Sequence, residues 1–500
     1  MGNRGKNETM EESNVLTQKP LQQSKLPLYC KSIDWDGFFA ENPPPDVWCE
    51  HVFLKWSRDQ IQAYQERRFL AIMELGWKNK FYRRFWGEAG IEPGDIRGLA
   101  DLEKLPIFSS EDVKKSIEDH PPFGEVCGID DPLAYMSQVP LKLQTSGGTT
   151  GAPRPTLFGP TDWELNGLTT ARHIYVQGGR PGDVLQATAT LSFANFGWAY
   201  YQAAHHYLGM LPVTTGSGVV TPTRKQLEYA IALGTNIWAS FPEYFTQLAK
   251  VAETELGRNV RDFKTKMLLS YLGPDLDNSL RRHLEELWGC PVYDNYGTHE
   301  TNSCAFEGKE QDGLYIMEDL AIMEFLDPES MKPVPTGQAG DIVFTHLHRR
   351  IPPLIRYNLR DLGRIKHEGK SPSGSNFRRM DKFLGRSDQM VKIRGVNIYP
   401  MACLSAVRSD ERTTGEWICI PQRVEQGGVL REEMIVKVEV RGNAGSWDGL
   451  QEHLERRFKE DLGIKTPVVL VPEGQLPETN VGKEGKPRRL LDLRGTVIQR

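Results

Sequence analysis

The chain has 500 residues, and since a single hydrophobic core rarely grows beyond about 250–300 residues, its length predicts more than one domain. Its 61 basic residues nearly balance 66 acidic ones, and a formal net charge of −5 argues against nucleic acid or an anionic membrane as an obligatory partner. No run of about 18 apolar residues occurs, so the sequence predicts no membrane-spanning helix.

The first residues and the cysteines indicate the cellular setting. Residues 1–25 are polar and lack the apolar stretch of a secretory signal, so we expect a disordered tail. The seven cysteines are scattered, odd in number and never spaced as Cys-x-x-Cys, which argues against a disulfide framework and a compact zinc site. A reducing, cytoplasmic setting is the simplest interpretation.

Secondary structure signals begin with a capping box, Ser57-x-x-Gln60, which predicts the start of an amphipathic helix. From about Leu141, short apolar runs alternate with helical segments. Strands are predicted at residues 141–145, 184–189, 236–240 and 267–271, and helices from the capping boxes Thr161-x-x-Glu164 and Ser240-x-x-Glu243 and over residues 279–287, with Gly289 as the stop. This alternation favours right-handed crossovers and a largely parallel sheet covered by helices.

The pattern changes towards the C-terminus. Residues 313–325 and 341–346 are strand-like, and the last 110 residues form a different unit. Strands are predicted at 433–440 and 467–471, and one helical face carries Leu450, Leu454, Phe458 and Leu462 at i,i+4 spacing. The predicted fold class is therefore α/β, with a large N-terminal domain of parallel, helix-covered sheets over residues 26–387 and a small α+β domain over residues 388–500.

A loop of glycines and hydroxyls follows the strand at 141–145. It reads Thr145-Ser146-Gly147-Gly148-Thr149-Thr150-Gly151-Ala152-Pro153-Arg154. Glycines let the backbone approach an anion closely, while hydroxyls and exposed N–H groups donate to phosphate oxygens. No Gly-Lys-Ser/Thr follows, so this is not the P-loop of common NTPases. By itself, such a loop is more often a tight turn.

Further motifs follow this loop in a fixed order. They are Tyr293-Asp294-Asn295-Tyr296-Gly297-Thr298-His299-Glu300, Arg356-Tyr357-Asn358-Leu359-Arg360-Asp361, Gly385-Arg386-Ser387-Asp388, Gly395-Val396-Asn397 and Glu484-Gly485-Lys486-Pro487-Arg488-Arg489. Together they resemble the adenylate-forming superfamily of acyl-CoA synthetases, adenylation domains and luciferases. Residues 313–319, 327–329, 352–357 and 395–400 extend the likeness to the phenylacetate–CoA ligase family, from about residue 57 to the end of the chain.

The resemblance implies an ATP-dependent, AMP-forming acid–CoA ligase. A carboxylate attacks the α-phosphate of ATP, which expels pyrophosphate and leaves an acyl-adenylate. The small C-terminal domain, which this resemblance implies is mobile, then rotates, and the thiol of CoA attacks the activated carbonyl. The implied partners are ATP, Mg²⁺, CoA and a small carboxylic acid, and the implied assembly is a monomer or a homodimer.

The resemblance also assigns the nucleotide site. The residues it places at ATP or AMP are Thr145, Ser146, Gly147, Gly148, Thr149, Thr150, Gly151, Gly273, Pro274, Asn295, Tyr296, Gly297, Thr298, Asp361 and Arg386. The ring of Tyr296 offers a face for adenine, and Asn295 can hydrogen-bond its exocyclic amine. Asp361 can accept from the ribose hydroxyls, and Arg386 can donate to the nucleotide. Alternatively, Tyr296 is an ordinary buried aromatic and Asp361 pairs with Arg360 or Arg364.

Three residues are implied to act in the chemistry. Glu300 is a hard oxygen ligand suited to Mg²⁺. Lys486 is a mobile charge that can stabilise the negative charge of the transition state. His299 stands where relatives carry Ser or Thr, and it either donates to the substrates or turns into the wall. The alternatives are a solvated Glu300 and a Lys486 that belongs to a charged surface run, with Lys483 as its rival.

The resemblance places further functions near the domain boundary. Asp388 corresponds to the hinge, and Lys392 and Gly395 lie on the side of CoA. Arg154 replaces the usual lysine of the phosphate loop, which keeps the charge but not the geometry. The cysteine pair that the family usually carries is absent from residues 369–379, so we predict no zinc.

The acid pocket is implied to be aromatic. Its predicted lining comprises Phe193, Asn195, Phe196, Trp198, Trp238 and Phe241. Ring-on-ring contacts favour flat apolar acids, so the prediction is an aryl or arylacetic acid. Two alternatives stay open: an adenylating enzyme whose acceptor is a carrier protein or an amine, and a nucleotide-binding regulator without catalysis. The presence of Glu300, Asp361 and Lys486 argues against the regulator.

Overall fold

The computed structural model describes residues 25–146, 154–276, 278–387, 391–393, 396–426, 429–476, 489–494 and 497–499. Nearly all of the predicted tail therefore lies outside the described residues. Within the described part, no helix is both long and apolar enough to cross a membrane. All seven cysteines are free thiols.

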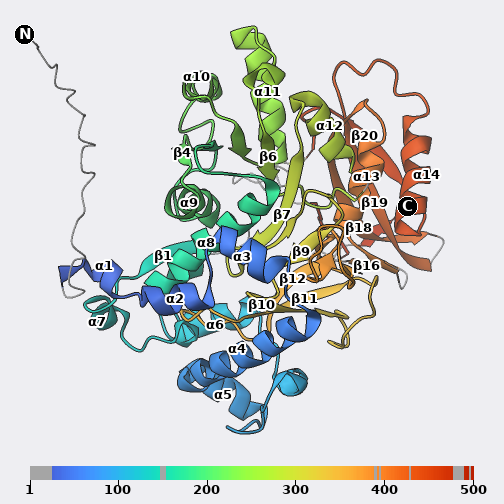
Figure 1. The fold of residues 1–500 in the computed structure, drawn as a ribbon. Helices are drawn as coiled ribbons and strands as arrows, with labels where there is room; N and C mark the ends of the chain where they lie inside the picture. The colour runs from blue at the N-terminus through green and yellow to red at the C-terminus, as the bar shows by residue number, and fades with distance from the viewer. Residues whose placement is uncertain are drawn as a thin grey trace, which may run out of the picture.

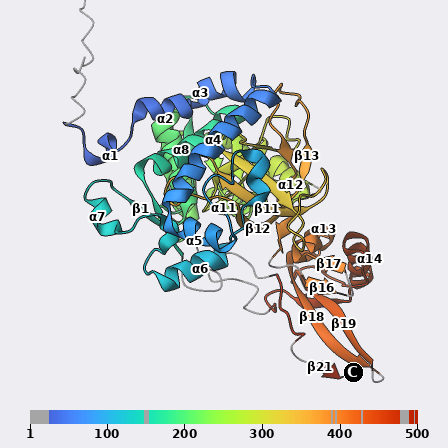
Figure 2. The same ribbon diagram turned by 90° about the horizontal axis from the view of Figure 1, so that it is seen from below.

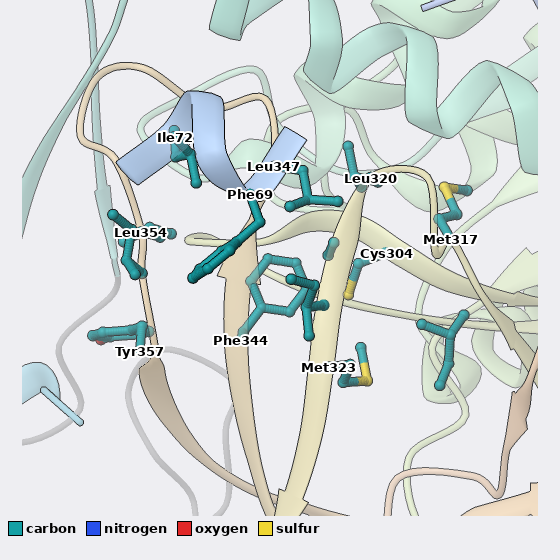
Figure 3. Packing of buried hydrophobic residues seen from close by; sticks show 14 of the residues in the cluster. Phe69, Ile72, Cys304, Met317, Leu320, Met323, Phe344, Leu347, Leu354 and Tyr357 are labelled. Atoms are coloured by element: carbon teal, nitrogen blue, oxygen red, sulfur yellow. The ribbon is translucent and has the colours of Figure 1, made fainter. Parts of the chain in front are cut away.

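Residues 25–140 are mainly helical (Figure 1). They are α1 (Leu28–Lys31), α2 (Trp35–Glu41), α3 (Pro45–Trp48), α4 (Arg58–Lys78), α5 (Lys80–Glu88), α6 (Ser110–Asp119) and α7 (Pro132–Met136). Helix α4 begins as predicted, because the side chains of Ser57 and Gln60 each accept from the other's backbone N–H. Figure 3 shows Phe69 and Ile72 of α4 packed towards Phe344 of the main core.

The centre of the large domain is a nine-stranded sheet in the order β13-β14-β9-β8-β7-β6-β5-β3-β4. Its parallel half consists of β3 (Val184–Ala187), β4 (Leu211–Thr214), β5 (Ile237–Ala239), β6 (Met267–Ser270) and β7 (Val292–Thr298). Helices cover both faces of this half. One face is covered by α8 (Pro160–Gln177) and α9 (Asn195–Gln202). The other face is covered by α10 (Thr223–Leu233), α11 (Pro242–Leu256) and α12 (Ser279–Trp288). The helix-covered parallel sheet is thus confirmed for this half.

The other half corrects the prediction of parallel sheets. Strand β8 (Asn302–Glu307) pairs antiparallel with β7, and β9 (Leu314–Ile316), β14 (Arg379–Met380) and β13 (Ile365–His367) follow in the sheet, each antiparallel to its neighbour. A second, four-stranded antiparallel sheet contains β10 (Ala321–Leu326), β11 (Gly340–His346), β12 (Tyr357–Gly363) and β15 (Gly385–Arg386). The reason lies in the connections: β7 and β8 are joined by a tight turn, and only antiparallel strands can be joined that way.

Two predicted helix caps are wrong. Helix α8 starts at Pro160 and α11 at Pro242, so neither Thr161 nor Ser240 is the cap. A proline with its fixed φ is preorganised for the first helical position, and here it sets the start of both helices. Helix α12 ends as predicted, because Gly289 adopts a left-handed φ of 69°.

The C-terminal part forms a separate lobe of the ribbon (Figure 2), and it has its own hydrophobic core. Its elements are β16 (Val391–Ile393), β17 (Val396–Ile398), α13 (Cys403–Arg408), β18 (Thr413–Gln426), β19 (Val429–Val440), α14 (Leu450–Leu462), β20 (Val468–Pro472) and β21 (Val497–Gln499). The predicted face of α14 is buried through Leu450, Leu454, Phe458 and Leu462. This α+β unit is confirmed, while the boundary at residues 387 and 388 stays a prediction, because residues 388–390 lie outside the described part.

Candidate active site

Three side chains assigned to the nucleotide meet where the two large sheets approach each other. Tyr296 lies on β7, while Asp361 on β12 lies in register with Arg386 on β15. The hydroxyl of Tyr296 donates to Oδ2 of Asp361 at 2.8 Å, and Nη1 of Arg386 donates to Oδ1 at 2.9 Å. Arg364, an alternative partner for Asp361, instead pairs with Asp381 at 2.6 Å. Asp361 is thus held with both oxygens in defined directions.

Tyr296 and Asn295 are more enclosed than an adenine-binding role suggests. Tyr296 is 5% exposed, and the ring of Phe383 lies nearly parallel to it with centroids 6.3 Å apart. The amide of Asn295 donates to the carbonyl of Ser270 at 3.2 Å and accepts from Gln177 at 2.9 Å. Burial and the charge on Asp361 raise the pKa of Tyr296, so its hydroxyl stays a donor. Contact with adenine stays a prediction for both residues.

The wall segment Gly273-Pro274 follows β6. Gly273 adopts a left-handed φ of 69°, and a Cβ at this position would meet no atom within 4 Å. The backbone N–H of Leu272, just before it, donates to Oδ1 of Asp294 at 2.8 Å. The segment therefore presents open space beside a backbone that β7 holds in place.

The turn from β7 to β8 carries the remaining motif residues. A Cβ on Gly297 would lie 2.1 Å from the carbonyl oxygen of Asn302, so this position of the hairpin requires glycine. The hydroxyl of Thr298 accepts from the N–H groups of Glu300 at 3.2 Å and Thr301 at 3.3 Å. Thr298 shapes the turn through these contacts, and a contact between Thr298 and the nucleotide stays a prediction.

Glu300 is a charged residue in a largely buried place. Its side chain is 19% exposed, and its Oε1 lies 3.2 Å from Nη2 of Arg154, so the solvated alternative is wrong. Burial works against its charge, but the neighbouring His299, the guanidinium of Arg154 and nearby donors outweigh that effect and lower the pKa of Glu300. An ionised carboxylate is the kind of oxygen ligand that Mg²⁺ requires, so Glu300 fits the predicted role.

His299 precedes Glu300 and faces the aromatic side of the turn. Its ring stands edge-on to Phe158 with centroids 5.9 Å apart, and its buried Nε2 has no hydrogen-bond partner in the described part of the chain. Burial lowers the pKa of His299 to about 4, against the opposing charge of Glu300. A neutral imidazole has one donor nitrogen and one acceptor nitrogen. Donation by His299 to a substrate stays a prediction.

Arg154 begins β2 (Arg154–Phe158), which pairs with β1 (Lys142–Ser146) across the phosphate loop. Besides Glu300, its guanidinium reaches the hydroxyl of Tyr357 at 3.3 Å. The planar fork of arginine suits two separate acceptors, which a lysine ammonium would not hold in the same geometry. The backbone N–H of Thr145 donates to the carbonyl of Phe193 at 3.2 Å, which ties the start of the loop to the predicted acid pocket.

Several predicted residues cannot be placed. Gly147, Gly148, Thr149, Thr150, Gly151, Asp388, Gly395 and Lys486 lie outside the described residues, as do the side chains of Ser146 and Lys392. The roles assigned to them stay predictions.

Arg349 is a residue of this region that sequence reasoning missed. It is 1% exposed, donates to the carbonyl of Glu300 and lies over the ring of Phe158 at 4.3 Å. Burial lowers the pKa of Arg349 to about 10, although the charges of Asp162 and Glu300 oppose this. The sequence signal that could have indicated Arg349 is the Arg349-Arg350 pair, which lies one residue before the motif at residues 352–357.

Some of the predicted acid pocket converges. Phe196 at the start of α9 stacks on Phe241 with centroids 5.2 Å apart, and it meets the edge of Tyr271 at 5.5 Å. Phe241 is 50% exposed, so one side of this cluster is open. Phe196, Phe241 and Tyr271 are called the ring cluster below. Tyr271 ends the predicted strand at 267–271 but was not singled out.

Trp238 was predicted for this pocket and lies elsewhere. Successive strand residues face opposite sides of a sheet. Ala239 therefore lies on the side of α8 and α9, whereas Trp238 is fully buried on the other side with Trp288, 5.6 Å away. Trp238 is a core residue, contrary to prediction.

Three other predicted pocket residues lie beside the ring cluster rather than in it. Trp198, two residues after Phe196 on α9, faces Trp163 at 5.9 Å and the ammonium of Lys142 at 4.6 Å. Asn195 donates to Oδ1 of Asn166 at 2.6 Å. Phe193 is 59% exposed. Their contacts with the acid stay predictions.

Comparison with known proteins identifies the family of the chain. The AMP-binding enzyme family model matches residues 113–347, and the AMP-binding enzyme C-terminal domain model matches residues 395–494. The chain is 30% identical over 450 residues to phenylacetate–coenzyme A ligase of Pseudomonas putida, covering 88% of this chain and 95% of that protein. It is 29% identical over 463 residues to phenylacetate–coenzyme A ligase of Thermus thermophilus, covering 87% and 97%.

Among solved structures, 2-hydroxyisobutyryl-CoA ligase in the postadenylation state with 2-HIB-AMP matches with a TM-score of 0.75 at 26% identity, covering 89% of this chain and 91% of that one. The same ligase in the thioesterification state with 2-HIB-AMP and CoA matches with a TM-score of 0.63 at 27% identity, covering 88% and 91%. The chain therefore belongs to the phenylacetate–CoA ligase family of the adenylate-forming superfamily, and it is an AMP-forming acid–CoA ligase.

Proposed function

We propose that this ligase activates an aromatic carboxylic acid of about the size of benzoate or phenylacetate. The observation that carries the proposal is the ring cluster at the carboxyl ends of the parallel strands. Its Tyr271 lies two residues before Gly273 of the Gly273-Pro274 wall. Aromatic rings in offset or edge-on contact contribute about 0.5–1.5 kcal/mol beyond buried area. A flat acid can join this cluster from the open side of Phe241.

The names of the relatives leave the acid class open. The curated relatives are phenylacetate–coenzyme A ligases, whereas the structural relative acts on 2-hydroxyisobutyrate, a small branched hydroxy acid. The ring cluster supports the aromatic choice, because a hydroxy acid needs a hydrogen-bond partner for its hydroxyl, and the three clustered rings are mainly apolar. The first half-reaction would place the acid's carboxylate near Gly273 and its ring on Phe196.

We assign the nucleotide to the Asp361 side of the site. Asp361 would accept from the ribose hydroxyls, since both its oxygens already point in fixed directions. Glu300 would hold Mg²⁺, and because it is paired with Arg154, that guanidinium would then be shared with the phosphates. Bound Mg²⁺ would neutralise part of the phosphate charge. Lys486 would stabilise the charge that builds up between carboxylate and α-phosphate.

We assign the second half-reaction to CoA, with Asp388 as the hinge and Lys392 and Gly395 on the thiol side. The greater likeness to the postadenylation state than to the thioesterification state supports an arrangement of the two domains suited to the first half-reaction. A carrier-protein thiol or an amine in place of CoA, and a monomer or a homodimer, are alternatives that the experiment below and a sizing measurement separate.

The experiment is acid-dependent release of pyrophosphate over a panel of carboxylates, with and without CoA. The panel contains benzoate, phenylacetate, 2-hydroxyisobutyrate, acetate and a long-chain fatty acid. We expect the aromatic acids to give the highest kcat/KM and CoA to be consumed in step with pyrophosphate release. Neighbours that differ by one methylene should differ by about 1–3 kcal/mol, since apolar pockets discriminate no better.

A matched pair of variants ties the result to the ring cluster. Phe196→Ala should lower kcat/KM for aromatic acids more than for acetate, whereas Trp238→Phe should leave the ranking of acids unchanged, because Trp238 lies on the other face of the sheet. Preference for acetate, 2-hydroxyisobutyrate or a fatty acid over every aromatic acid would overturn the proposed substrate class.

A further inference from the structure

A short segment ahead of the predicted domain boundary contacts three elements of the proposed nucleotide site. Arg386 pairs with Asp361 at 2.9 Å. The ring of Phe383 lies beside that of Tyr296, with centroids 6.3 Å apart and planes at 18°. Lys382 reaches the loop that follows Gly273. The sequence assigned only Arg386 of this segment, as a donor to the nucleotide, and Lys382 has no assigned role.

The ammonium of Lys382 is buried and has an acceptor for each of its three donors. It donates to the carbonyl oxygen of Asp275 at 2.8 Å and to Oδ1 of Asn278 at 2.6 Å, and it lies 3.4 Å from Oδ2 of Asp275. Lys382 is 6% exposed and Asp275 is 2% exposed. A lysine ammonium has three donors, and a buried one persists only where these donors are met. The contact is therefore specific in direction.

Asp275 also holds the start of α12. Its carboxylate also accepts from the backbone N–H groups of Leu280 at 2.9 Å and Arg281 at 3.1 Å. At the other end of the same loop, Asp294 of β7 accepts from the N–H of Leu272. Gly273-Pro274 is thus held from both ends, although Gly273 itself has open space around it. Lys382 is the residue that joins the Asp275 end of this loop to the segment that carries Arg386.

We propose that Lys382 is a positioning residue for the nucleotide, which fixes the Gly273-Pro274 wall relative to the Asp361–Arg386 pair. The proposal rests on the assignment of the nucleotide to these elements. Because Lys382 and Arg386 lie on the same segment, the distance between the Gly273-Pro274 wall and Asp361 stays constant. Within the described part of the chain, the ammonium of Lys382 bonds to Asp275 and Asn278 and to none of the three rings of the ring cluster. Its loss should therefore affect ATP and not the acid.

The test is Lys382→Met, which keeps the length of the side chain and removes the ammonium. Pyrophosphate release is measured at varied ATP and at varied acid, and ATP affinity is measured separately by titration calorimetry. We expect KM and Kd for ATP to rise at least 10-fold, while KM for the acid stays within twofold. Lys332→Met, at an exposed lysine of the same domain, should leave both KM values unchanged.

Asp275→Asn is the second variant, for the case that Lys382→Met does not fold. It weakens the same contact but keeps an acceptor oxygen for α12, so it should raise KM for ATP in the same direction. Unchanged KM and Kd for ATP in a folded variant, or an equal rise of KM for both substrates, would overturn the proposal. Failure of the wild-type enzyme to activate any carboxylate would refute the proposed function instead, and the calorimetric Kd of Lys382→Met would still decide the role of Lys382.

Discussion

Gly297→Ala is the sharpest test of the geometry at the turn that carries Glu300. A Cβ at this position would lie 2.1 Å from the carbonyl oxygen of Asn302, where ordinary contact begins at 3.4 Å, so the backbone must retreat by roughly the difference, 1.3 Å. That carbonyl belongs to the strand paired with β7, so the retreat shifts the turn and with it Glu300.

The expected magnitude follows from this displacement. A misplacement of about 1 Å in a catalytic constellation can lower the rate about 100-fold, which corresponds to about 2.7 kcal/mol of transition-state free energy. The overpacked hairpin should also lose about 1–3 kcal/mol of folding free energy. We therefore expect kcat/KM for acid-dependent pyrophosphate release to fall about 100-fold, with a lower thermal midpoint.

Gly257→Ala separates the two effects. Gly257 ends α11 with a left-handed φ of 60°, and no atom lies within 4 Å of a Cβ built there. Alanine there costs about 1–2 kcal/mol of backbone strain without displacing a neighbour. This control should lower the thermal midpoint and leave kcat/KM near the wild-type value. A folded Gly297→Ala enzyme with kcat/KM within twofold of wild type would refute the argument that the turn requires glycine.

Lys486→Ala should lower the rate of adenylate formation about 100–1,000-fold and leave the Kd for ATP nearly unchanged, since its charge is needed in the transition state; single-turnover pyrophosphate release measures this. Gly395→Leu should spare pyrophosphate release and block thioester formation, which separate assays of the two half-reactions detect. Because the pKa of Glu300 is lowered, wild-type activity that needs its carboxylate is lost only as pH falls through that lowered pKa. Arg154→Met removes the compensating cation and leaves burial, so the acid limb of the kcat/KM profile should move to higher pH.

Each of these predictions has a result that contradicts it. Wild-type pyrophosphate release by Lys486→Ala would transfer the role to Lys483. Equal loss of both half-reactions in Gly395→Leu would indicate misfolding rather than a blocked thiol path. An unshifted acid limb in Arg154→Met, with Arg154→Lys as the charge-conserving control, would show that the ion pair does not govern the ionisation of Glu300.

The features that were predicted correctly from the sequence are set mainly by residues close to one another along the chain. The capping box at Ser57 and the glycine stop at Gly289 are local backbone chemistry, and both appear as expected. Tyr296, Asp361 and Arg386 were assigned from ordered motifs, and the structure brings them within hydrogen-bond distance across two sheets. Motifs of this kind record a shared site even though spacing in the sequence says nothing about distance in space.

What the sequence missed depends on contacts between distant segments. Residues 237–239 are buried on both faces, so no alternation reveals which face Trp238 takes. Proline at the first helical position overrode the capping boxes that Thr161 and Ser240 seemed to form. Arg349 and Lys382 are charged residues whose buried partners, the carbonyl of Glu300 and the loop at Asp275, lie far away along the chain.

The two-residue strand β15 has a consequence for the path of the chain. Gly385 and Arg386 are in register with Leu362 and Asp361, so strand pairing holds the chain to the large domain up to Arg386. The hydroxyl of Ser387 also donates to the carbonyl of Arg360 at 3.4 Å, so a rotation of the C-terminal unit about the predicted hinge at Asp388 would begin directly after these contacts. This pairing includes Asp361, the carboxylate proposed to accept from the ribose. A nucleotide bound to Asp361 would therefore contact the last strand pair before the small domain. On these assignments, nucleotide binding and rotation of the small domain would both act on the pairing of β12 with β15.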